Sequence, residues 1–292
     1  MKGIYKPTLW GGQHLREFGK RDLPDAPIGE VWETADLTPI GNGPLAGCTL
    51  AEVMRVWEGS LLGERSANSP RFPLLVKLID ANQQLSVQVH PNDAQAATLE
   101  GEPWGKTEAW HILKAAPDAE IVLGTKGCRD IETLRQQIAA GRLEHCLNHL
   151  PVSAGDTVYI PAGRIHALGK GIVAYEVQQQ SDITYRLYDW NRHDAAGKSR
   201  ELQIDKGLRV ATLDREPCVK EAPTVEQCAS YCRATLIACP YFVLEKLDAG
   251  SEGQIEVHSD GATFGIYTII GGSGQLRWGK QQAEPLALGD TV

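Results

Sequence analysis

The stretch GDTVYIPAGRIH, residues 155–166, decides how the fold of this chain is interpreted. Residues 156–160 are typical of a short strand, and Pro161 ends it because proline has no backbone N–H to donate to a sheet. Gly163 permits the tight bend that follows. The turn therefore presents His166 at the start of the next strand, in a fixed direction.

Strand patterns continue on both sides of this stretch. Apolar or alternating runs stand at residues 72–80, 85–90, 171–177, 241–247 and 262–270. Helical patterns are fewer, at residues 91–97 and 130–150, where apolar residues recur three and four apart. Strands on both sides of a helical insertion predict an all-β core with helical insertions, not alternating βαβ units.

The motif at Gly155–Val158 recurs at Gly289–Val292. A four-residue match can arise by chance, but the second copy also follows a hairpin-like stretch, which predicts a second, degenerate β domain. We therefore expect a first domain over residues 1–214, with the helical insertion around 130–150. An irregular connector over 215–240 and the second domain over 241–292 follow, and we expect the chain to end before that domain's last strands.

Composition narrows the class of protein. The 292 residues are 42% hydrophobic and 23% charged, which is ordinary for a soluble folded chain. The net charge of −8 and the lack of a basic run argue against broad nucleic-acid binding. No stretch reaches the roughly 20 apolar residues of a membrane span, and the first residues lack a signal-peptide core. These features predict a cytoplasmic protein without membrane or nucleic-acid partners, and they leave monomer and homodimer open.

The pattern Gly-x5-Pro-x-Gly-x2-His over residues 155–166 resembles the second motif of the cupin superfamily. Cupins are small jelly-roll barrels, and the resemblance implies a metal held inside one. One position departs from the motif, since Lys170 stands where asparagine is common. The alternative interpretation is that His166 is a buried structural histidine.

Three further residues complete a candidate metal site. Gln88 and His90 are two apart on one predicted strand, so their side chains leave the same face. Glu108 begins another strand-like run. Together with His166 they form a mixed nitrogen and oxygen set that suits Zn²⁺ with an open position for water or substrate. Fe²⁺ or Mn²⁺ would accept the same set, and a polar sheet face is the simpler alternative.

Longer ordered motifs resemble the type I mannose-6-phosphate isomerases, most closely their short bacterial form. They stand at residues 74–77, 85–91, 105–108, 160–167 and 176–190, and the likeness covers most of the chain. A minor departure is His111, where tyrosine is commoner. The resemblance implies an enzyme that interconverts mannose 6-phosphate and fructose 6-phosphate, with Zn²⁺ bound by Gln88, His90, Glu108 and His166.

The resemblance also implies active-site roles for a second set of residues, namely Ser86, Lys77, Lys106, Glu176, Arg186 and Arg192. A sugar phosphate dianion needs cations gathered locally in a chain of net charge −8. Lys77 interrupts an apolar run, where an idle ammonium would be costly to bury. The alternative is that these cations are ordinary solvated surface residues.

The chemistry assigns a role to each of these residues. Aldose–ketose isomerisation moves a proton between C2 and C1 through a cis-enediol(ate), so it needs a base and a stabiliser of oxygen charge. We expect Arg186 to stabilise that charge and Glu176 to be the base, with Lys106 as the alternative base. We assign phosphate recognition to Ser86, Lys77 and Arg192.

Two rival classes of function stay open at this point. Another metal-dependent cupin enzyme, such as an Fe(II) oxygenase or a different sugar-phosphate isomerase, would share the metal ligands. A non-catalytic sugar-binding cupin would keep the barrel and lose either the ligands or the acid–base pair.

Overall fold

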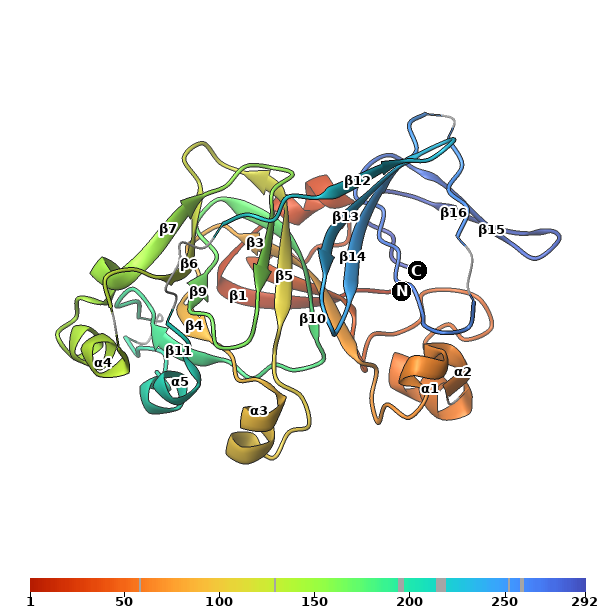
Figure 1. The fold of residues 1–292 in the computed structure, drawn as a ribbon. Helices are drawn as coiled ribbons and strands as arrows, with labels where there is room; N and C mark the ends of the chain where they lie inside the picture. The colour runs from red at the N-terminus through yellow and green to blue at the C-terminus, as the bar shows by residue number, and fades with distance from the viewer. Residues whose placement is uncertain (58, 129, 194–196, 214–218, 252, 258–259) are drawn as a thin grey trace. The chain divides into compact units, whose positions relative to one another are not determined.

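The computed structural model describes residues 1–292 except 58, 129, 194–196, 214–218, 252 and 258–259 (Figure 1). The strands are β1 (Ile4–Gly12), β2 (Ile28–Thr34), β3 (Leu74–Ala81), β4 (Val87–Val89), β5 (Glu108–Ala115), β6 (Glu120–Thr125), β7 (Leu147–Pro151), β8 (Thr157–Ile160), β9 (His166–Ala167), β10 (Ile172–Gln179), β11 (Tyr185–Tyr188), β12 (Thr224–Gln227), β13 (Cys232–Ala238), β14 (Val243–Asp248), β15 (Gly274–Trp278) and β16 (Gln282–Leu286). The α-helices are α1 (Leu50–Trp57), α2 (Gly59–Leu62), α3 (Asp93–Glu100), α4 (Ile131–Ala139) and α5 (Ile204–Val210). Short 3₁₀ helices are η1 (His14–Phe18), η2 (Glu64–Ser66) and η3 (Leu143–Cys146). The predicted all-β fold with helical insertions is confirmed, and no described helix is long and apolar enough to cross a membrane.

The chain forms two compact units, one of Met1–Asp80 with His258–Val292 and one of Ala81–Val257. In the first unit the two ends of the chain meet, because the Met1 amino group donates to the Thr291 carbonyl at 2.6 Å. These long-range contacts join the last residues to the first strands. The units therefore differ from the predicted ranges 1–214, 215–240 and 241–292. The cupin-like nature of the last range stays a prediction.

The first unit contains a buried ion pair next to its antiparallel strands β1, β2 and β3. The Lys20 ammonium lies 2.7 Å from the Glu33 carboxylate, and both side chains are buried. Thr291 Oγ1 donates to Glu33 Oε2 at 3.0 Å, and Lys20 Nζ donates to the Gly289 carbonyl at 2.5 Å. The pair thus links β2 to the C-terminal segment.

Replacing Glu33 by alanine is expected to lower the free energy of unfolding by about 3–5 kcal/mol, because it leaves the buried Lys20 ammonium without its carboxylate. Urea denaturation measures the change. Glu132 is a matched control, since its pair with Arg135 is exposed, and E132A should change stability by less than about 0.5 kcal/mol. Equal effects of the two substitutions would show that the buried pair contributes no more than a surface pair.

The second unit contains two sheets that carry the predicted metal ligands Gln88, Glu108 and His166, and His90 directly follows β4. Strands β10, β5 and β8 pair in that order, and β11, β4, β9, β6 and β7 form a five-stranded sheet. On the second sheet, Val87 and Val89 belong to a buried cluster with α4 and α5. Because successive side chains on a strand alternate, Gln88 between them faces away from this cluster. The apolar face of the sheet thus packs on helices, and its polar face is left for the site.

Three sequence-based expectations about local structure are wrong. The helix expected over 130–150 ends at Ala139, since Gly141 adopts a φ of 67° and residues 147–151 pair with β6 as β7. Residues 262–270 form no continuous strand, and only the stretch 267–269 pairs, with residues 289–292, around the bridge of Thr268 to Thr291. Instead Phe264 packs on Phe72, with ring centroids 5.0 Å apart. The expected irregular connector contains β12 and β13, while its residues 215–218 lie outside the described residues.

The repeated motif forms the same turn twice. Gly155 and Gly289 both adopt left-handed backbone, with φ of 94° and 88°. Asp156 Oδ2 accepts from the backbone N–H three residues before it at 2.7 Å, and Asp290 Oδ2 does so at 2.8 Å. The first copy leads into β8, and the second leads into the bridge at Thr291. The repeat therefore encodes a turn and carries no site chemistry.

Candidate metal centre

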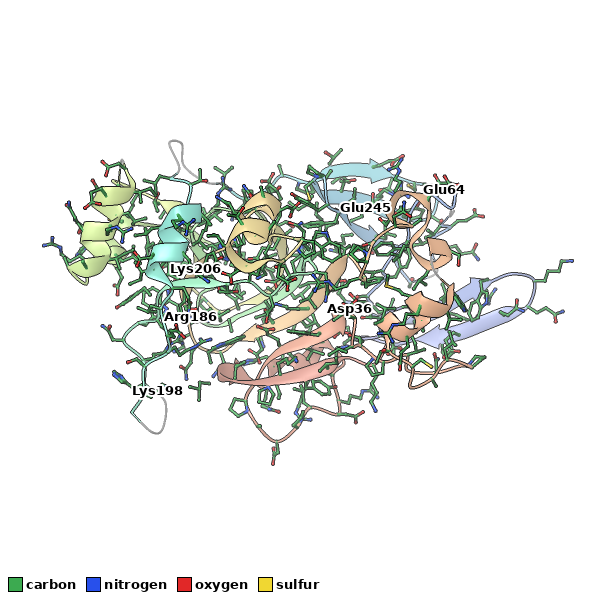
Figure 2. The ribbon with its side chains drawn as sticks, turned by 90° about the horizontal axis from the view of Figure 1, so that it is seen from below. Asp36, Glu64, Arg186, Lys198, Lys206 and Glu245 are labelled. Atoms are coloured by element: carbon green, nitrogen blue, oxygen red, sulfur yellow. The ribbon has the colours of Figure 1, made fainter. Side chains whose placement is uncertain are left out.

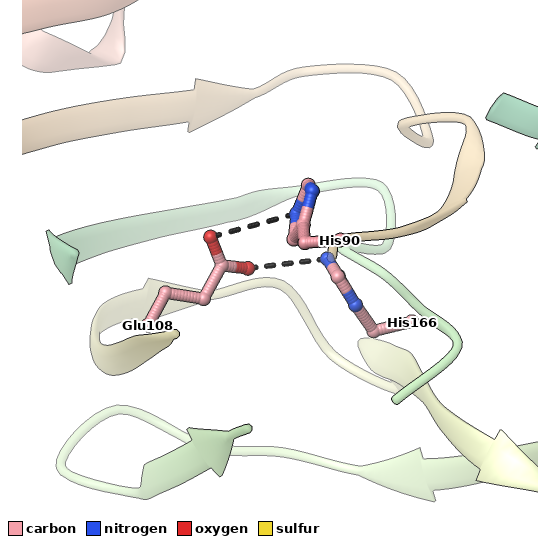
Figure 3. A group of neighbouring side chains, drawn as sticks. All are labelled: His90, Glu108 and His166. Atoms are coloured by element: carbon pink, nitrogen blue, oxygen red, sulfur yellow. Dashed lines mark ion pairs between the residues drawn. The ribbon is translucent and has the colours of Figure 1, made fainter. Parts of the chain in front are cut away.

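Two histidines and one glutamate meet inside the second unit. The ligand atoms of His90, Glu108 and His166 all lie within 4.8 Å of one another, and the three side chains are fully buried. Glu108 Oε1 lies 3.1 Å from His166 Nε2, and Glu108 Oε2 lies 3.8 Å from His90 Nε2. Figure 3 shows the carboxylate directed at both rings. The structure thus brings together three of the four predicted metal ligands.

The turn after β8 explains how His90 and His166 come together. Gly163 adopts a φ of 89°, as its predicted role in a tight bend requires. Its N–H donates to the His90 carbonyl at 2.8 Å, so the turn lies against the end of β4. His166 follows three residues later at the start of β9, where it pairs with Gln88 of β4. The ring centroids of the two histidines lie 4.8 Å apart.

Backbone carbonyls fix the orientation of both imidazoles. His90 Nδ1 lies 2.8 Å from the Ile183 carbonyl, and His166 Nδ1 lies 2.8 Å from the Arg164 carbonyl. A carbonyl only accepts hydrogen bonds, so each Nδ1 carries the proton and each Nε2 keeps a lone pair for a metal. Sequence reasoning missed both partners, because any residue type could supply the carbonyl.

Electrostatics keep the centre in a metal-binding form. Burial lowers the pKa of His90 well below its usual value, and the Lys106 ammonium lowers it further, against the opposing charge of Glu108. Burial opposes ionisation of Glu108, but Lys106 and the two histidines together hold its pKa well below its usual value. Lys106 Nζ lies 2.7 Å from Glu108 Oε2 and 3.2 Å from His90 Nε2. A neutral His90 and an ionised Glu108 are the forms that bind divalent cations.

The residues present fit a divalent metal. Glu108 Oε1 and His166 Nε2 are buried and have no hydrogen-bond partner among the described residues, while Glu108 Oε2 pairs with the Lys106 ammonium at 2.7 Å. Glu108 Oε1 and the His166 Nε2 lone pair face each other at 3.1 Å, and two acceptor atoms in this arrangement are favourable when one cation binds both of them. Two ligand atoms about 2.1 Å from a tetrahedral zinc lie about 3.4 Å apart, which matches the spacing of this set. The same nitrogen and oxygen donors also suit Fe²⁺ or Mn²⁺.

One row of paired residues leads from the metal centre to Arg186. Gln88 pairs with His166 on one side and with Arg186 of β11 on the other. Directly paired residues on neighbouring strands point their side chains to the same face. Gln88, which is half-buried, thus lies next to His166, and its role as the fourth ligand stays a prediction.

Arg186 lies in a group of cations, and Figure 2 labels it. Its Nε donates to Ser86 Oγ at 3.0 Å, as expected if these two predicted residues act together. Burial lowers the pKa of Arg186, and the charges of Arg200 and Arg192 lower it further, while Asp189 opposes them. Arg192 and Arg200 also pair with the Asp189 carboxylate, so the positive charge near Arg186 is partly balanced.

The guanidinium of Arg192 makes hydrogen bonds and an ion pair with neighbouring residues of the chain. Its Nη1 donates to the Gln84 carbonyl at 2.6 Å, its Nε donates to the Asp189 carbonyl at 3.3 Å, and its Nη2 pairs with the Asp189 carboxylate. Trp190 and Asn191 between them both adopt left-handed backbone, with φ of 55° and 52°. Arg192 therefore stabilises a tight turn. Sequence reasoning missed the buried Asp189, since nothing in the local pattern marks it as buried.

Glu176 lies behind Trp110 on the face that carries Glu108. Trp110 Nε1 donates to Glu176 Oε2 at 2.7 Å, and the edge of its ring packs on His166 with centroids 5.5 Å apart. The register of β10 and β5 pairs Glu176 with Trp110 and Gln178 with Glu108, so all four side chains share one face. The Trp110 side chain thus contacts both Glu176, the predicted base, and His166, a predicted metal ligand.

Lys77 belongs to the first unit, on β3. It is buried, as its position in an apolar run predicted, and it lies 3.6 Å from Glu30 Oε2 and 5.7 Å from the centre of the Trp32 ring. An ion pair and a cation–π contact together offset the cost of burying this ammonium. Its phosphate role stays a prediction.

Comparison with known proteins identifies the family. Residues 1–110 match the family model of the phosphomannose isomerase type I catalytic domain. The chain is 39% identical to the mannose-6-phosphate isomerase ManA of Bacillus subtilis, over 96% of this chain and 87% of that protein. This chain belongs to the mannose-6-phosphate isomerase family. The mannose-6-phosphate isomerase of Streptococcus mutans is 37% identical over 94% of this chain and 85% of that protein.

A solved structure agrees with this family assignment. The crystal structure of the mannose 6-phosphate isomerase from Bacillus subtilis matches 99% of this chain and 91% of that chain, with a TM-score of 0.89 and 33% identity. The predicted family and cupin-type fold class are thereby confirmed. The prediction of an isomerase, in preference to an oxygenase or a non-catalytic sugar-binding protein, is confirmed at the level of the family.

Proposed function

We propose that this chain interconverts mannose 6-phosphate and fructose 6-phosphate with a zinc ion bound by His90, Glu108, His166 and Gln88. The observation that carries the proposal is the buried cluster of the first three residues, whose lone pairs converge in a chain of this family. When bound, the metal would act as a Lewis acid toward the oxygens on C1 and C2 of the sugar.

The chain's own residues would move the proton and balance the charge. Glu176 would take the proton from one carbon and return it to the other, with its carboxylate oriented by Trp110 at 2.7 Å. Lys106 is the alternative base, which would act as the neutral amine, and its Nζ lies 2.7 Å from Glu108 Oε2 in the ligand cluster. Arg186 would stabilise the negative oxygen of the enediolate. Because Ser86 already holds its guanidinium, little reorganisation accompanies the reaction.

The cations around Asp189 support recognition of a phosphate dianion. Arg192 and Arg200 pair with this carboxylate, and the charges of both act on Arg186, so cations outnumber the carboxylate here. A local excess of positive charge in a chain of net charge −8 would favour binding of a sugar phosphate dianion. The proposed phosphate contacts remain those predicted from the sequence, namely Ser86, Lys77 and Arg192. A cytoplasmic location, without nucleic-acid or membrane partners, is part of the same proposal.

Chelation tests the metal requirement. We expect conversion of mannose 6-phosphate to fructose 6-phosphate, followed in a coupled assay, to fall to background after treatment with EDTA and to return when zinc is added. Protein treated with zinc-saturated EDTA is the control and should keep its activity. Activity that is indifferent to the chelator, or a reaction that consumes oxygen, would contradict the proposal and favour a different cupin enzyme.

A further inference from the structure

Lys106 and Glu108 lie on a short segment that is fixed by contacts to its backbone. The Gly105 N–H donates to Asp93 Oδ1 at 2.8 Å, and the Lys106 N–H donates to the Pro91 carbonyl at 3.0 Å. A Cβ on Gly105 would lie 2.3 Å from the Pro91 carbonyl oxygen, so the two stretches of chain are in direct contact. Residues 91–93 directly follow the metal ligand His90, so these contacts set its distance from Glu108.

Gln179 connects both sides of this arrangement. It is the last residue of β10 and only 3% exposed. Its Oε1 accepts from the Thr107 N–H at 2.9 Å, and its Nε2 donates to Asp93 Oδ1 at 2.9 Å. Its own backbone N–H donates to the Thr107 carbonyl at 3.2 Å. One amide group therefore joins the segment after His90 to the segment that carries Lys106 and Glu108.

The other contacts of Asp93 and Thr107 make this bridge rigid. Asp93 is the first residue of α3, which begins with a capping box at Asn92, and its Oδ2 accepts from the Tyr241 hydroxyl at 3.2 Å. Thr107 Oγ1 accepts from the Ala162 N–H at 3.3 Å, in the turn that presents His166. The partners of Gln179 thus reach the stretches that deliver all three metal ligands.

We propose that Gln179 is a positioning residue of the metal centre, which holds the His90 segment and the Lys106–Glu108 segment at the separation that the site requires. It acts through Asp93 and Thr107. Loss of its amide would leave the buried Thr107 N–H without its partner and would remove one of the two hydrogen bonds that Asp93 Oδ1 accepts. The backbone contacts of Gly105 and Lys106 alone would then hold the two segments, with more freedom in their separation. The expected effect on metal affinity is independent of the proposed function, whereas the expected effect on turnover rests on it.

The variant Q179M tests the role, because methionine keeps the length of the side chain and removes both hydrogen bonds. We expect zinc to bind about 10–100-fold more weakly, as found when outer partners of metal ligands are removed. Competition of the metal-free protein with a chromophoric chelator measures this affinity. We also expect kcat to fall about 10–100-fold with KM within about threefold, since the ligands and base move while the cations around Asp189 stay. Q179N, whose shorter amide reaches one partner at most, should show the same pattern and serves if Q179M does not fold.

L134A is the control for a purely structural effect. Leu134 is a fully buried residue of α4 in the cluster behind the five-stranded sheet, so its truncation lowers the melting temperature and leaves zinc affinity and kcat unchanged. The proposal is overturned if Q179M also lowers only the melting temperature. If wild-type protein binds zinc without isomerase activity while Q179M weakens zinc binding, the positioning role stands and the proposed function fails. If wild-type protein is active and both Gln179 variants match it in zinc affinity and kcat, the positioning role fails alone.

Discussion

Replacing His166 by alanine is expected to abolish isomerase activity and to weaken zinc binding by more than about a hundredfold, beyond the effect of losing an outer partner. His166 Nε2 is buried 3.1 Å from Glu108 Oε1 and has no hydrogen-bond partner among the described residues. The substitution therefore removes a ligand and breaks no hydrogen bond on the metal side. Lys106 still pairs with Glu108 at 2.7 Å, so the remaining carboxylate keeps a counter-charge and the fold should survive.

Metal content after dialysis and chelator competition measure the effect on binding, and the coupled assay measures turnover. His149 offers a matched control, since it lies on β7, is partly exposed and pairs with Glu120 at 2.6 Å. H149A should keep both metal content and activity. An H166A protein that binds zinc as tightly as wild type would show that the metal lies elsewhere, and the proposed centre would have to be abandoned.

The sequence allowed the centre of the site to be predicted because its geometry is local. Pro161 and Gly163 determine the turn within a few residues of His166, and the alternation around Gln88 determines its face. The ligand Glu108 required only that its strand lie within reach, which a cupin barrel provides. Short-range rules and one family resemblance thus sufficed to predict the all-β class and three of the four side chains that were expected to meet, while their role as metal ligands stays a prediction.

Other parts of the site depend on contacts that residue types do not reveal. The carbonyls that orient His90 and His166 belong to Ile183 and Arg164, whose side chains are irrelevant to that role. Gln179 bonds to Asp93, which lies 86 positions earlier in the sequence, and to Thr107, which lies 72 positions earlier. The C-terminal segment was assigned to a separate domain because only the folded chain shows Thr291 bonded to Glu33. These features depend on long-range pairing, which a local sequence pattern cannot encode, and the predicted domain ranges stay a prediction.

Replacing Glu176 by glutamine is expected to lower kcat about 10²–10⁴-fold, the usual contribution of a general base, while zinc and substrate binding are retained. The amide oxygen of glutamine can still accept the hydrogen bond that Trp110 Nε1 donates at 2.7 Å, so the ring that packs on His166 should not move. Steady-state kinetics measures kcat, and metal content measures zinc binding. Equilibrium binding of a non-reacting sugar phosphate measures substrate binding. E120Q, at a half-exposed glutamate of β6, is the control and should leave kcat unchanged.

K106M distinguishes the two candidate bases. Methionine removes an ammonium that lies 2.7 Å from Glu108 and 3.2 Å from His90, and a cation so placed repels a divalent metal. Zinc affinity should therefore rise or hold in K106M, while it stays constant in E176Q. The fall of kcat at low pH reports protonation of the catalytic base. If Glu176 is that base, this fall disappears in E176Q and persists in K106M. Unchanged kcat in E176Q together with lost turnover in a zinc-loaded K106M would remove Glu176 from the mechanism and assign the proton transfer to Lys106.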